Sequence, residues 1–563
     1  MKTPETTRTP VDGLSLVRGP TDTPLSDETV HDVLAATARR WPQRDAAVFI
    51  EQGLRWTWLQ LQQQVECAAA GLVRLGVKKG DRVGIWSPNR AEWLVTQFAT
   101  ARIGAILVNI NPAYRLAELE YALNTAGVGV LVTAAAFKNS NYLGMLQNLG
   151  LGPAGLSAKL PQLKTVVRLG EEPTAGMLNW RLLVDAGVSH TDALPDGSRL
   201  SCHEAINIQF TSGTTGTPKG ATLTHHNIVN NARAVAHCMR FTEADSLCIP
   251  VPLYHCFGMV LSVLACVASG AKMVFPGEGF DARATLAAVE AEQCTALHGV
   301  PTMFIAELDH AEFARFDLHT LRTGIMAGAP CPVEIMRRVQ SDMHMHEVTI
   351  AYGMTETSPV SFQSATDDPL DKRVATVGRV LPHLAVKIVD AEDRTVPVGE
   401  KGELCTRGYS VMLGYWGDEE RTAAAVRDGW MHTGDLATID AEGYCNIVGR
   451  VKDMVIRGGE NIYPREVEEI LFRHPKVAAV QVFGIPDARY GEELCAWIIT
   501  KSGAACTEDE IRAFCREQIS HYKVPRYIRF VEELPVTVTG KPQKFVMREA
   551  MMRELGLGLL ATT

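Results

Sequence analysis

The sequence predicts an α/β protein with a large N-terminal domain and a small C-terminal domain, and three observations lead to this class. At 563 residues the chain is too long to fold around one hydrophobic core. From Thr29 onward, helical and strand-like apolar patterns alternate, as they do in layered α/β structures with mainly parallel strands. The pattern then changes twice, to glycine-punctuated alternation after Thr376 and to a compact α+β pattern after Val451.

In the first part, helices are expected where apolar residues recur at helical spacing, and strands where short apolar runs end at turn residues. The expected helices are Val30–Arg40, Leu59–Leu75, Arg90–Gly104 and Leu116–Thr125. The expected strands are Ala46–Phe49, Asp81–Trp86, Ala105–Asn109 and Gly127–Val132. The stretch Leu146–Pro161 is rich in glycine, leucine and proline, which predicts an irregular connection.

The remaining elements follow from the same patterns. Gly258–Phe275 is strongly apolar but is broken by Gly270 and Lys272, which indicates a buried helix followed by a strand and no membrane span. Alternation over Thr376–Arg407 predicts antiparallel strands of a small β-barrel-like subdomain. Beyond it we expect two helices and two strands, Arg465–Arg473, Val477–Phe483, Leu494–Thr500 and Glu508–Ile519. The domains are therefore placed at residues 1–450 and 451–563.

Charge and cysteine content limit the partners and the compartment. The formal net charge of −9 disfavours a general nucleic-acid binder. Thirteen cysteines without a Cys-x-x-Cys pair fit a reducing compartment. Met1–Pro20 has neither the apolar run of a signal peptide nor the Arg-rich pattern of a transit peptide, so we expect a cytoplasmic protein.

The ten residues from Thr211 to Gly220 form the most informative motif. They contain three glycines, five hydroxyl residues and Lys219, and they follow a strand-like stretch, Ala205–Phe210. Glycines let backbone N–H groups point at an anion, and hydroxyl and ammonium groups bind phosphate oxygens. Because glycine follows the lysine, this is not a Walker A loop. The alternative is a polar surface turn, which such a skewed composition disfavours.

This loop resembles the signature of the adenylate-forming enzymes, which include acyl-CoA synthetases, luciferases and peptide-synthetase adenylation domains. Further segments follow in the order of that family: Met326-Ala-Gly-Ala-Pro330, Tyr352-Gly-Met-Thr-Glu356, Trp430-Met-His-Thr-Gly-Asp435, Gly449–Glu468 and Thr539-Gly-Lys541. The resemblance implies that the nucleotide phosphates contact Thr211, Ser212, Gly213, Thr214, Thr215, Gly216, Thr217 and Lys219. It also implies an adenine pocket of Gly328, Ala329, Pro330 and a stacked Tyr352.

The resemblance assigns the remaining nucleotide contacts to acidic, basic and hydroxyl side chains. Thr355 would meet the α-phosphate, and Glu356 would help to hold Mg²⁺, which prefers hard oxygen ligands. Asp435 would accept from the ribose hydroxyls, with Arg450 beside it. Taken alone, these segments could be strand ends, turns and surface side chains.

The last two segments carry the catalytic lysine and the hinge of the family. Lys541 would offset charge while the substrate carboxylate approaches the α-phosphate, acting with Thr355 and Glu356. Lys452 would be the hinge of a mobile C-terminal domain, which brings Gly458 and Gly459 to the CoA side in the second half-reaction. Read without the resemblance, Lys541 is a solvated surface lysine and the glycine pair a loop.

The acyl pocket is expected to contain His255, Phe257, Gly299 and Val300. His255 could contact the acyl carboxyl or gate the pocket, or it could be a satisfied core histidine. Val251–Phe275 contains no Asp or Glu to pair with a substrate ammonium group, which favours an uncharged acyl chain.

Within the family, the chain is most similar to medium-chain acyl-CoA synthetases of the acyl-CoA-synthetase-family-member-two type. This implies a ligase that converts a fatty acid, ATP and CoA into acyl-CoA, AMP and pyrophosphate, with Mg²⁺ as cofactor. An aryl, branched or sulfur-containing acid and a carrier-protein-loading adenylation module are the alternatives. No nucleic acid is expected as a partner, and the assembly could be a homodimer.

Overall fold

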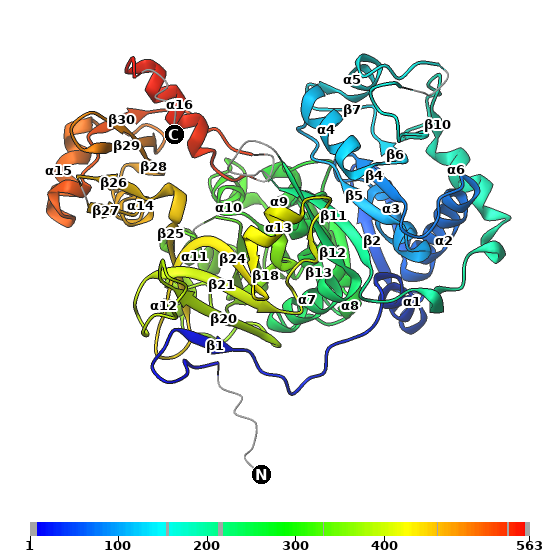
Figure 1. Ribbon diagram of the computed structural model, residues 1–563, viewed down its shortest axis with the longest axis horizontal. Coiled ribbons are helices and arrows are strands. Elements are labelled where there is room, and N and C mark those ends of the chain that lie inside the picture. The colour runs from blue at the N-terminus through cyan, green and yellow to red at the C-terminus, as the bar shows by residue number, and fades with distance from the viewer. Residues whose placement is uncertain are drawn as a thin grey trace, which may run out of the picture.

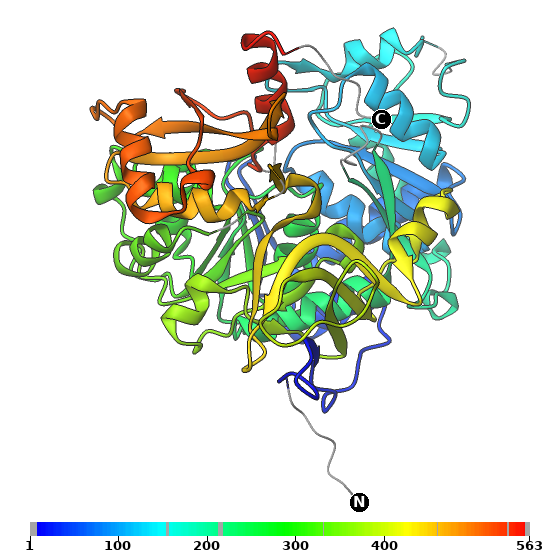
Figure 2. The ribbon, with the colours of Figure 1, turned by 60° about the vertical axis from the view of Figure 1, so that its left-hand side comes forward.

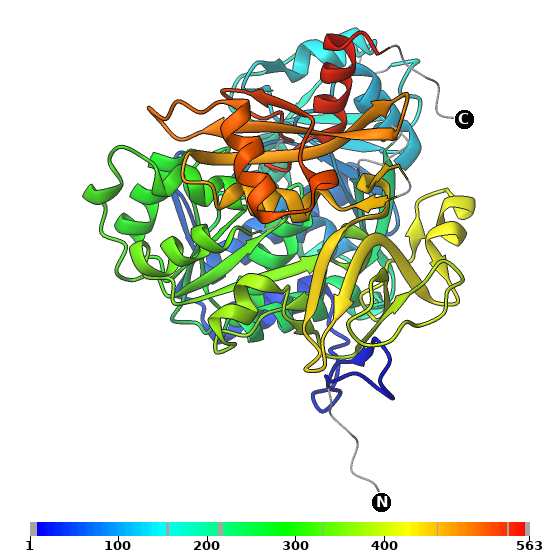
Figure 3. The ribbon, with the colours of Figure 1, turned by 90° about the vertical axis from the view of Figure 1, so that its left-hand side faces the viewer.

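The computed structural model describes residues 8–153, 157–211, 218–329, 331–458, 460–537 and 540–557. Two large mixed sheets, a small antiparallel sheet and a C-terminal sheet organise this part of the chain. In Figure 1 the C-terminal unit, coloured orange to red, lies at the upper left. Figures 2 and 3 show from the side that it lies across the top of the N-terminal domain.

The first sheet is mainly parallel and its order is β10-β9-β6-β4-β5-β11-β12-β22. The hydrogen-bonded neighbours are parallel as far as β11 and antiparallel at β12 and β22. The strands span Leu178–Asn179, Thr165–Arg168, Val130–Thr133, Arg82–Trp86, Ile106–Asn109, Ala205–Thr211, Lys219–Thr224 and Gly414–Tyr415.

The second sheet has the order β19-β18-β17-β16-β15-β13-β14-β2-β3 and is parallel from β17 to β2. Its strands span Arg379–Val380, Val360–Gln363, Glu347–Gly353, Thr323–Ala327, Ala296–Gly299, Ser246–Cys248, Lys272–Phe275, Asp45–Phe49 and Leu54–Thr57. Parallel sheets are normally covered on both faces, and helices supply that cover here.

Three layers of helices enclose the two sheets. The largest core lies between the sheets and contains helices α1, α2, α3, α7 and α8 together with a π-helix, Phe257–Leu264. A second core packs α4 and α5 on the first sheet, and a third packs α9, α10 and α11 on the second sheet. These helices span Val30–Arg40 (α1), Trp58–Arg74 (α2), Ala91–Ile103 (α3), Leu116–Ala126 (α4), Tyr142–Asn148 (α5), His225–Cys238 (α7), Ala265–Ser269 (α8), Ala282–Glu292 (α9), Pro301–Leu308 (α10) and Val333–Asp342 (α11). Three further helices span Trp180–Val188 (α6), Leu370–Ala375 (α12) and Glu419–Ala425 (α13).

The barrel-like subdomain is a sheet of antiparallel strands, as the alternation after Thr376 predicts. Its order is β1-β20-β21-β24-β23, and β25 pairs with β24. The strands span Leu16–Arg18, Leu384–Val389, Gly402–Gly408, Trp430–Ile439, Val426–Arg427 and Cys445–Arg450. The N-terminal segment therefore returns to a sheet formed mostly by residues far along the chain.

The C-terminal unit has its own sheet and its own core. Helices α14, α15 and α16 span Pro464–Phe472, Glu508–Gln518 and Lys544–Glu554, and strands β26 to β30 span Val455–Arg457, Glu460–Ile462, Val477–Asp487, Gly491–Thr500 and Tyr527–Phe530. The placement of a domain boundary near Lys452 stays a prediction. The α/β fold class with a barrel-like subdomain and a small C-terminal domain is confirmed.

Local capping explains why several helices begin where the sequence predicts. The Thr29 hydroxyl accepts the Asp32 N–H, and the Asp32 carboxylate accepts the Thr29 N–H, so a capping box starts α1. Gly104 and Gly127 adopt left-handed backbone conformations at the ends of α3 and α4, where a β-carbon would be unfavourable.

Two expected elements differ from the structure. The stretch expected to be irregular, Leu146–Pro161, overlaps the last residues of helix α5. This helix begins after Asn141, whose side chain caps its first turn by accepting the Gly144 N–H. The second is the strand expected to end at Phe483, which continues to Asp487 as β28 because its hairpin partner β29 begins at Gly491. Among the described residues, none of the helices combines the length and apolar character needed to cross a membrane.

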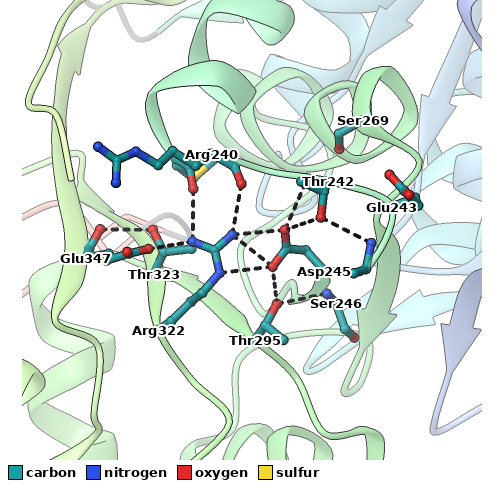
Figure 4. A network of polar contacts seen from close by, with 12 residues as sticks. Arg240, Thr242, Glu243, Asp245, Ser246, Ser269, Thr295, Arg322, Thr323 and Glu347 are labelled. Atoms are coloured by element: carbon teal, nitrogen blue, oxygen red, sulfur yellow. Dashed lines mark hydrogen bonds and ion pairs between the residues drawn. The ribbon is translucent and has the colours of Figure 1, made fainter. Parts of the chain in front are cut away.

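A charged network joins the amino ends of the parallel strands in the second sheet (Figure 4). The Arg322 guanidinium donates to Asp245 at 2.9 Å and to Glu347 at 2.6 Å. The Asp245 carboxylate is buried and also accepts from the Thr295 hydroxyl at 2.7 Å. Because these residues stand just before or at the start of β13, β15, β16 and β17, the network fixes the edge opposite the carboxyl ends of the strands.

We expect Arg322→Ala to lower the stability of the N-terminal domain by about 2–3 kcal/mol, because Asp245 would stay buried without its guanidinium partner. Thermal unfolding measures the change as a lower midpoint. Arg240→Ala is the matched control, since Arg240 pairs with Asp367 on the exposed surface and such pairs contribute about 0–1 kcal/mol. Equal shifts in the two variants would contradict the structural role of the network.

Candidate active site

The candidate site lies at the carboxyl ends of the parallel strands of the second sheet. Strands β15, β16 and β17 end at Gly299, Ala327 and Gly353. The segments that follow them carry Val300, Gly328, Thr355 and Glu356, which are residues of the predicted site. Ligands commonly bind at this edge of a parallel α/β sheet, because the loops from neighbouring strands meet there.

The residues at the two ends of the phosphate loop, Thr211 and Lys219, belong to the first sheet, and Thr211 contacts this edge. Thr211 ends β11 and pairs across the hairpin with Lys219, which begins β12. The Thr211 hydroxyl lies 3.4 Å from Glu356 Oε1, and the Lys219 ammonium lies 4.9 Å from the centre of the Tyr415 ring. The predicted phosphate contacts Ser212, Gly213, Thr214, Thr215, Gly216 and Thr217 lie outside the described residues.

Glu356 is a buried carboxylate at the centre of the site. It stands on a short 3₁₀-helix, Thr355–Thr357, directly after β17. The Tyr415 hydroxyl donates to Glu356 Oε1 at 2.8 Å. Burial, and to a lesser extent the Glu356 carboxylate, raises the pKa of Tyr415, so the phenol stays protonated. Sequence reasoning gave Tyr415 no role, because nothing in a local motif indicates a partner this far along the chain.

Asp435 is the second buried carboxylate, and both of its oxygens have partners. The Tyr352 hydroxyl donates to Oδ2 at 2.6 Å, and Arg450 Nε donates to Oδ1 at 2.9 Å. Asp435 and Arg450 are directly opposite each other on β24 and β25. Asp435 chiefly raises the pKa of Arg450, and burial chiefly raises that of Tyr352. The structure thus brings together three residues that the sequence places in separate motifs.

Lys541 reaches this site from the C-terminal unit. Two hydrogen bonds to Thr537 hold its backbone: the Lys541 N–H donates to the Thr537 hydroxyl at 3.1 Å, and the Thr537 N–H donates to the Lys541 carbonyl at 2.8 Å. A β-carbon on Gly328 would lie 3.7 Å from Lys541 Cε, so the lysine side chain runs past the end of β16. Burial, and to a lesser extent the nearby Arg450 charge, lowers the pKa of Lys541.

The Lys541 side chain lines a small apolar cavity. Its volume is about 10 Å³, the space of one water molecule, and its lining residues are Val251, Pro252, His255, Phe257, Val300, Gly328 and Lys541. Three of the four predicted acyl-pocket residues are among them. The fourth, Gly299, ends β15 beside the cavity, where a β-carbon would approach the Phe304 ring to 3.0 Å.

His255 is neutral in this cavity. Its Nδ1 accepts the Phe257 N–H at 3.1 Å. Burial and then the Lys541 charge lower its pKa to about 3. A second histidine, His298, is fully buried beneath the pocket, with Nδ1 3.0 Å from the Ser262 hydroxyl. Apart from Lys541, the pocket therefore has an uncharged lining, which comes from residues between Val251 and Phe257, from Val300 after β15 and from Gly328 after β16.

The remaining predicted residues lie at the connection between the units or in the neighbouring loops. Lys452 is in a 3₁₀-helix, Val451–Asp453, between β25 and β26. Gly458 has a left-handed backbone, and its N–H donates to the Tyr490 carbonyl within the C-terminal unit. Ala329 follows Gly328, whereas Pro330 and Gly459 lie outside the described residues. In this arrangement the C-terminal unit presents Lys541 to the site, and Gly458 contacts its own unit.

Comparisons with known proteins agree with this geometry. The AMP-binding enzyme family matches residues 34–416, and the AMP-binding enzyme C-terminal domain matches residues 466–541. The chain is 47% identical to the putative acyl-CoA synthetase YngI of Bacillus subtilis, over 95% of this chain and 99% of that protein. It is 46% identical to the mitochondrial medium-chain acyl-CoA ligase ACSF2 of Danio rerio, over 96% of this chain and 91% of that protein.

A solved structure supports the same assignment. The anthranilate CoA ligase AuaEII in complex with anthranoyl-AMP has a TM-score of 0.86 and 28% identity, over 95% of this chain and 99% of that chain. The chain therefore belongs to the AMP-binding enzyme family, and it is a ligase of the acyl-CoA synthetase class. This confirms the resemblance seen in the motifs. The roles of individual site residues, including those that local motifs indicate, stay predictions.

Proposed function

We propose that the protein is an ATP-dependent ligase for medium-chain fatty acids, and that the residues described above perform its two half-reactions. The observation that carries this proposal is the position of Lys541, a half-buried lysine that lines the proposed acyl cavity and lies within electrostatic reach of the Asp435–Arg450 pair. Asp435 and Arg450 are proposed to hold the ribose. Tyr352, Gly328, Ala329 and Pro330 are proposed to contact adenine.

In the first half-reaction the fatty carboxylate attacks the α-phosphorus of ATP, and pyrophosphate leaves. Two anions must approach each other, and the Lys541 ammonium would offset their repulsion. Thr355 would donate to the α-phosphate, while the phosphate loop and Lys219 would hold the leaving phosphates. No protein nucleophile is needed, because positioning and charge neutralisation lower the barrier.

Mg²⁺ fits the donor set around Glu356. A buried carboxylate with the Thr211 hydroxyl 3.4 Å away supplies hard oxygen ligands beside the phosphate loop. When bound, the ion would neutralise charge on the triphosphate. Glu356 would hold it, and Tyr415 would keep the carboxylate oriented through its 2.8 Å hydrogen bond.

In the second half-reaction the CoA thiol attacks the acyl carbon, and AMP leaves. The C-terminal unit is proposed to turn about Lys452, which withdraws Lys541 and brings Gly458 and Gly459 to the site. Support comes from the structure of the connection, a single short helical turn between β25 and β26. A motion of this kind needs only a few backbone dihedrals to change.

The apolar lining of the cavity favours a fatty acid over an amino acid. The stretch Val251–Phe275 contains no carboxylate, and His255 is neutral, so nothing in that stretch would pair with a substrate ammonium group. The aryl, branched or sulfur-containing acids remain the competing substrates, and a carrier protein the competing acceptor. Cytoplasmic location and a homodimer also stay predictions; some relatives are named mitochondrial.

A panel of acids tests the proposed substrate. With ATP, Mg²⁺ and CoA, AMP release should be fastest with unbranched medium-length fatty acids, and kcat/KM should rise with chain length until the pocket ends. Each buried methylene contributes about 0.8 kcal/mol, or roughly fourfold, to binding. An amino or aryl acid that outperforms octanoate would contradict the proposal, as would transfer to a carrier protein in preference to CoA.

A further inference from the structure

Three side chains outside the active site converge as metal ligands do. The carboxylate of Asp27, the thiol of Cys202 and the imidazole of His203 have ligand atoms that all lie within 4.8 Å of one another. Cys202 Sγ is 3.8 Å from Asp27 Oδ1. The imidazole of His226 lies beside that of His203, with 4.7 Å between the ring centres.

Three separate elements hold this cluster in place. Asp27 belongs to residues 19–28, the N-terminal strap, which is the dark-blue segment from β1 to α1 in Figure 1. Cys202 and His203 form the turn before β11, and His226 is in the first turn of α7. The His226 N–H donates to the Cys202 carbonyl at 2.7 Å, which fixes the turn to the helix.

The strap itself is attached to α7 next to the cluster. The Ser26 N–H donates to the Asn230 side chain at 2.7 Å, and the Asn230 amide donates back to the Ser26 carbonyl at 2.9 Å. Arg233 on the same helix forms an ion pair with Glu28. Asp27 lies between these two anchors, so its carboxylate is held near Cys202 by contacts that do not involve the cluster.

The ligand chemistry identifies the ion. Thiolate, imidazole and carboxylate together are the donors of zinc, whereas Mg²⁺ and Ca²⁺ prefer oxygen alone. Zn–S bonds of about 2.3 Å and Zn–O bonds of about 2.0 Å in a tetrahedron place sulfur and oxygen roughly 3.5 Å apart. The Asp27–Cys202 separation of 3.8 Å is close to that value, so a small side-chain movement would complete the geometry.

A second cluster shows by contrast what excludes a metal. Glu403, Cys405 and His432 also converge, but Arg427 Nη2 lies 2.6 Å from His432 Nδ1 and places a positive charge there. Glu403 in addition accepts the Gly434 N–H at 2.9 Å. This second group is explained as a hydrogen-bond network beside Asp435, and it supplies a built-in comparison for the first.

We propose that Asp27, Cys202 and His203 form a zinc-binding site that clamps the N-terminal strap to the turn before β11, with His226 of α7 or water as the fourth ligand. Zinc would replace the thiol proton of Cys202, which leaves to solvent. Since the strap connects β1 of the barrel-like subdomain to α1, the ion would fix this connection against the edge of the first sheet at β11. Nothing in this proposal depends on the acid that the enzyme activates.

The test is metal binding by chelator-treated full-length protein. We expect one equivalent of Zn²⁺ in equilibrium dialysis, and a thiolate-to-metal absorption band when Co²⁺ is used as the probe. Cys202→Ser should remove the band and weaken Zn²⁺ binding at least about tenfold. His203→Ala, at an exposed position that leaves the core intact, should also weaken binding. In both variants the rise in melting temperature with Zn²⁺ should be lost.

Cys67→Ser is the matched control, because Cys67 is a half-buried thiol on α2. This variant should bind Zn²⁺ and Co²⁺ as the unaltered protein does. The proposal fails if the unaltered protein binds no stoichiometric zinc. It also fails if His203→Ala keeps full affinity, or if the Co²⁺ band survives in Cys202→Ser but disappears in Cys405→Ser, which would place the metal at the second cluster.

Discussion

Lys541→Ala should slow the formation of acyl-AMP by about 10²–10³-fold, which is the usual effect of removing one group that stabilises transition-state charge. The lysine lines the cavity that we propose for the acyl chain, and burial already lowers its pKa. Its charge is needed only while carboxylate and phosphate approach each other. Thioester formation from supplied acyl-AMP should therefore be largely spared.

The two half-reactions are measured separately. Acid-dependent pyrophosphate release without CoA reports the first, and acyl-CoA formation from acyl-AMP reports the second. Lys476→Ala is a suitable control, because Lys476 pairs with Glu510 on the surface of the same unit and should change neither rate. Equal losses of both half-reactions in Lys541→Ala would mean that the lysine does not act in the first step alone.

Lys452→Pro should also affect the two half-reactions unequally. Here thioester formation should be lost and adenylation largely kept, which is the opposite of the effect expected for Lys541→Ala. Proline is tolerated in the first turn of a helix, and its fixed φ of about −65° suits the 3₁₀-turn in which Lys452 lies here. The substitution should hold the unit where Lys541 faces the nucleotide. We expect thioester formation to fall at least about tenfold more than adenylation, a difference of about 1.4 kcal/mol in barrier.

Lys452→Ala is the control for this variant, because it removes the same side chain and leaves the backbone free to rotate. It should keep both rates close to those of the unaltered enzyme. If proline lowers both half-reactions alike while the protein stays folded, or lowers neither, the hinge is not at Lys452.

Local signals account for much of what could be predicted. The start of α1 depends on a capping box between Thr29 and Asp32, and the end of α4 depends on Gly127. Both signals involve only residues close in sequence, so these two helix boundaries can be predicted from the sequence. Strand β28 extends beyond Phe483, where the local pattern predicts its end, because its pairing with β29 continues through Pro486, whose missing N–H is tolerated near the end of the hairpin.

The candidate active site likewise has a part that could be predicted from sequence and a part that could not. Its motifs were recognisable because each is a short run with unusual composition, as in the phosphate loop. The contacts between motifs were not predictable, since the Tyr415 hydroxyl on Glu356 and the Tyr352 hydroxyl on Asp435 join segments that only tertiary packing brings together. The π-helix beside the acyl cavity was also beyond prediction, because a buried apolar run gives no sign of its helical pitch.

The small size of the cavity that Lys541 lines has a consequence for discrimination among acids. A space of about 10 Å³ must expand before any acyl chain can enter, so every acid meets at least a common free-energy penalty for the initial opening. The apparent affinity is reduced by the fraction of molecules that are open. Short acids have few methylenes, each worth about 0.8 kcal/mol, with which to offset that fixed penalty. We therefore expect selection against short acids to come from the resting state of the pocket as much as from its shape when filled.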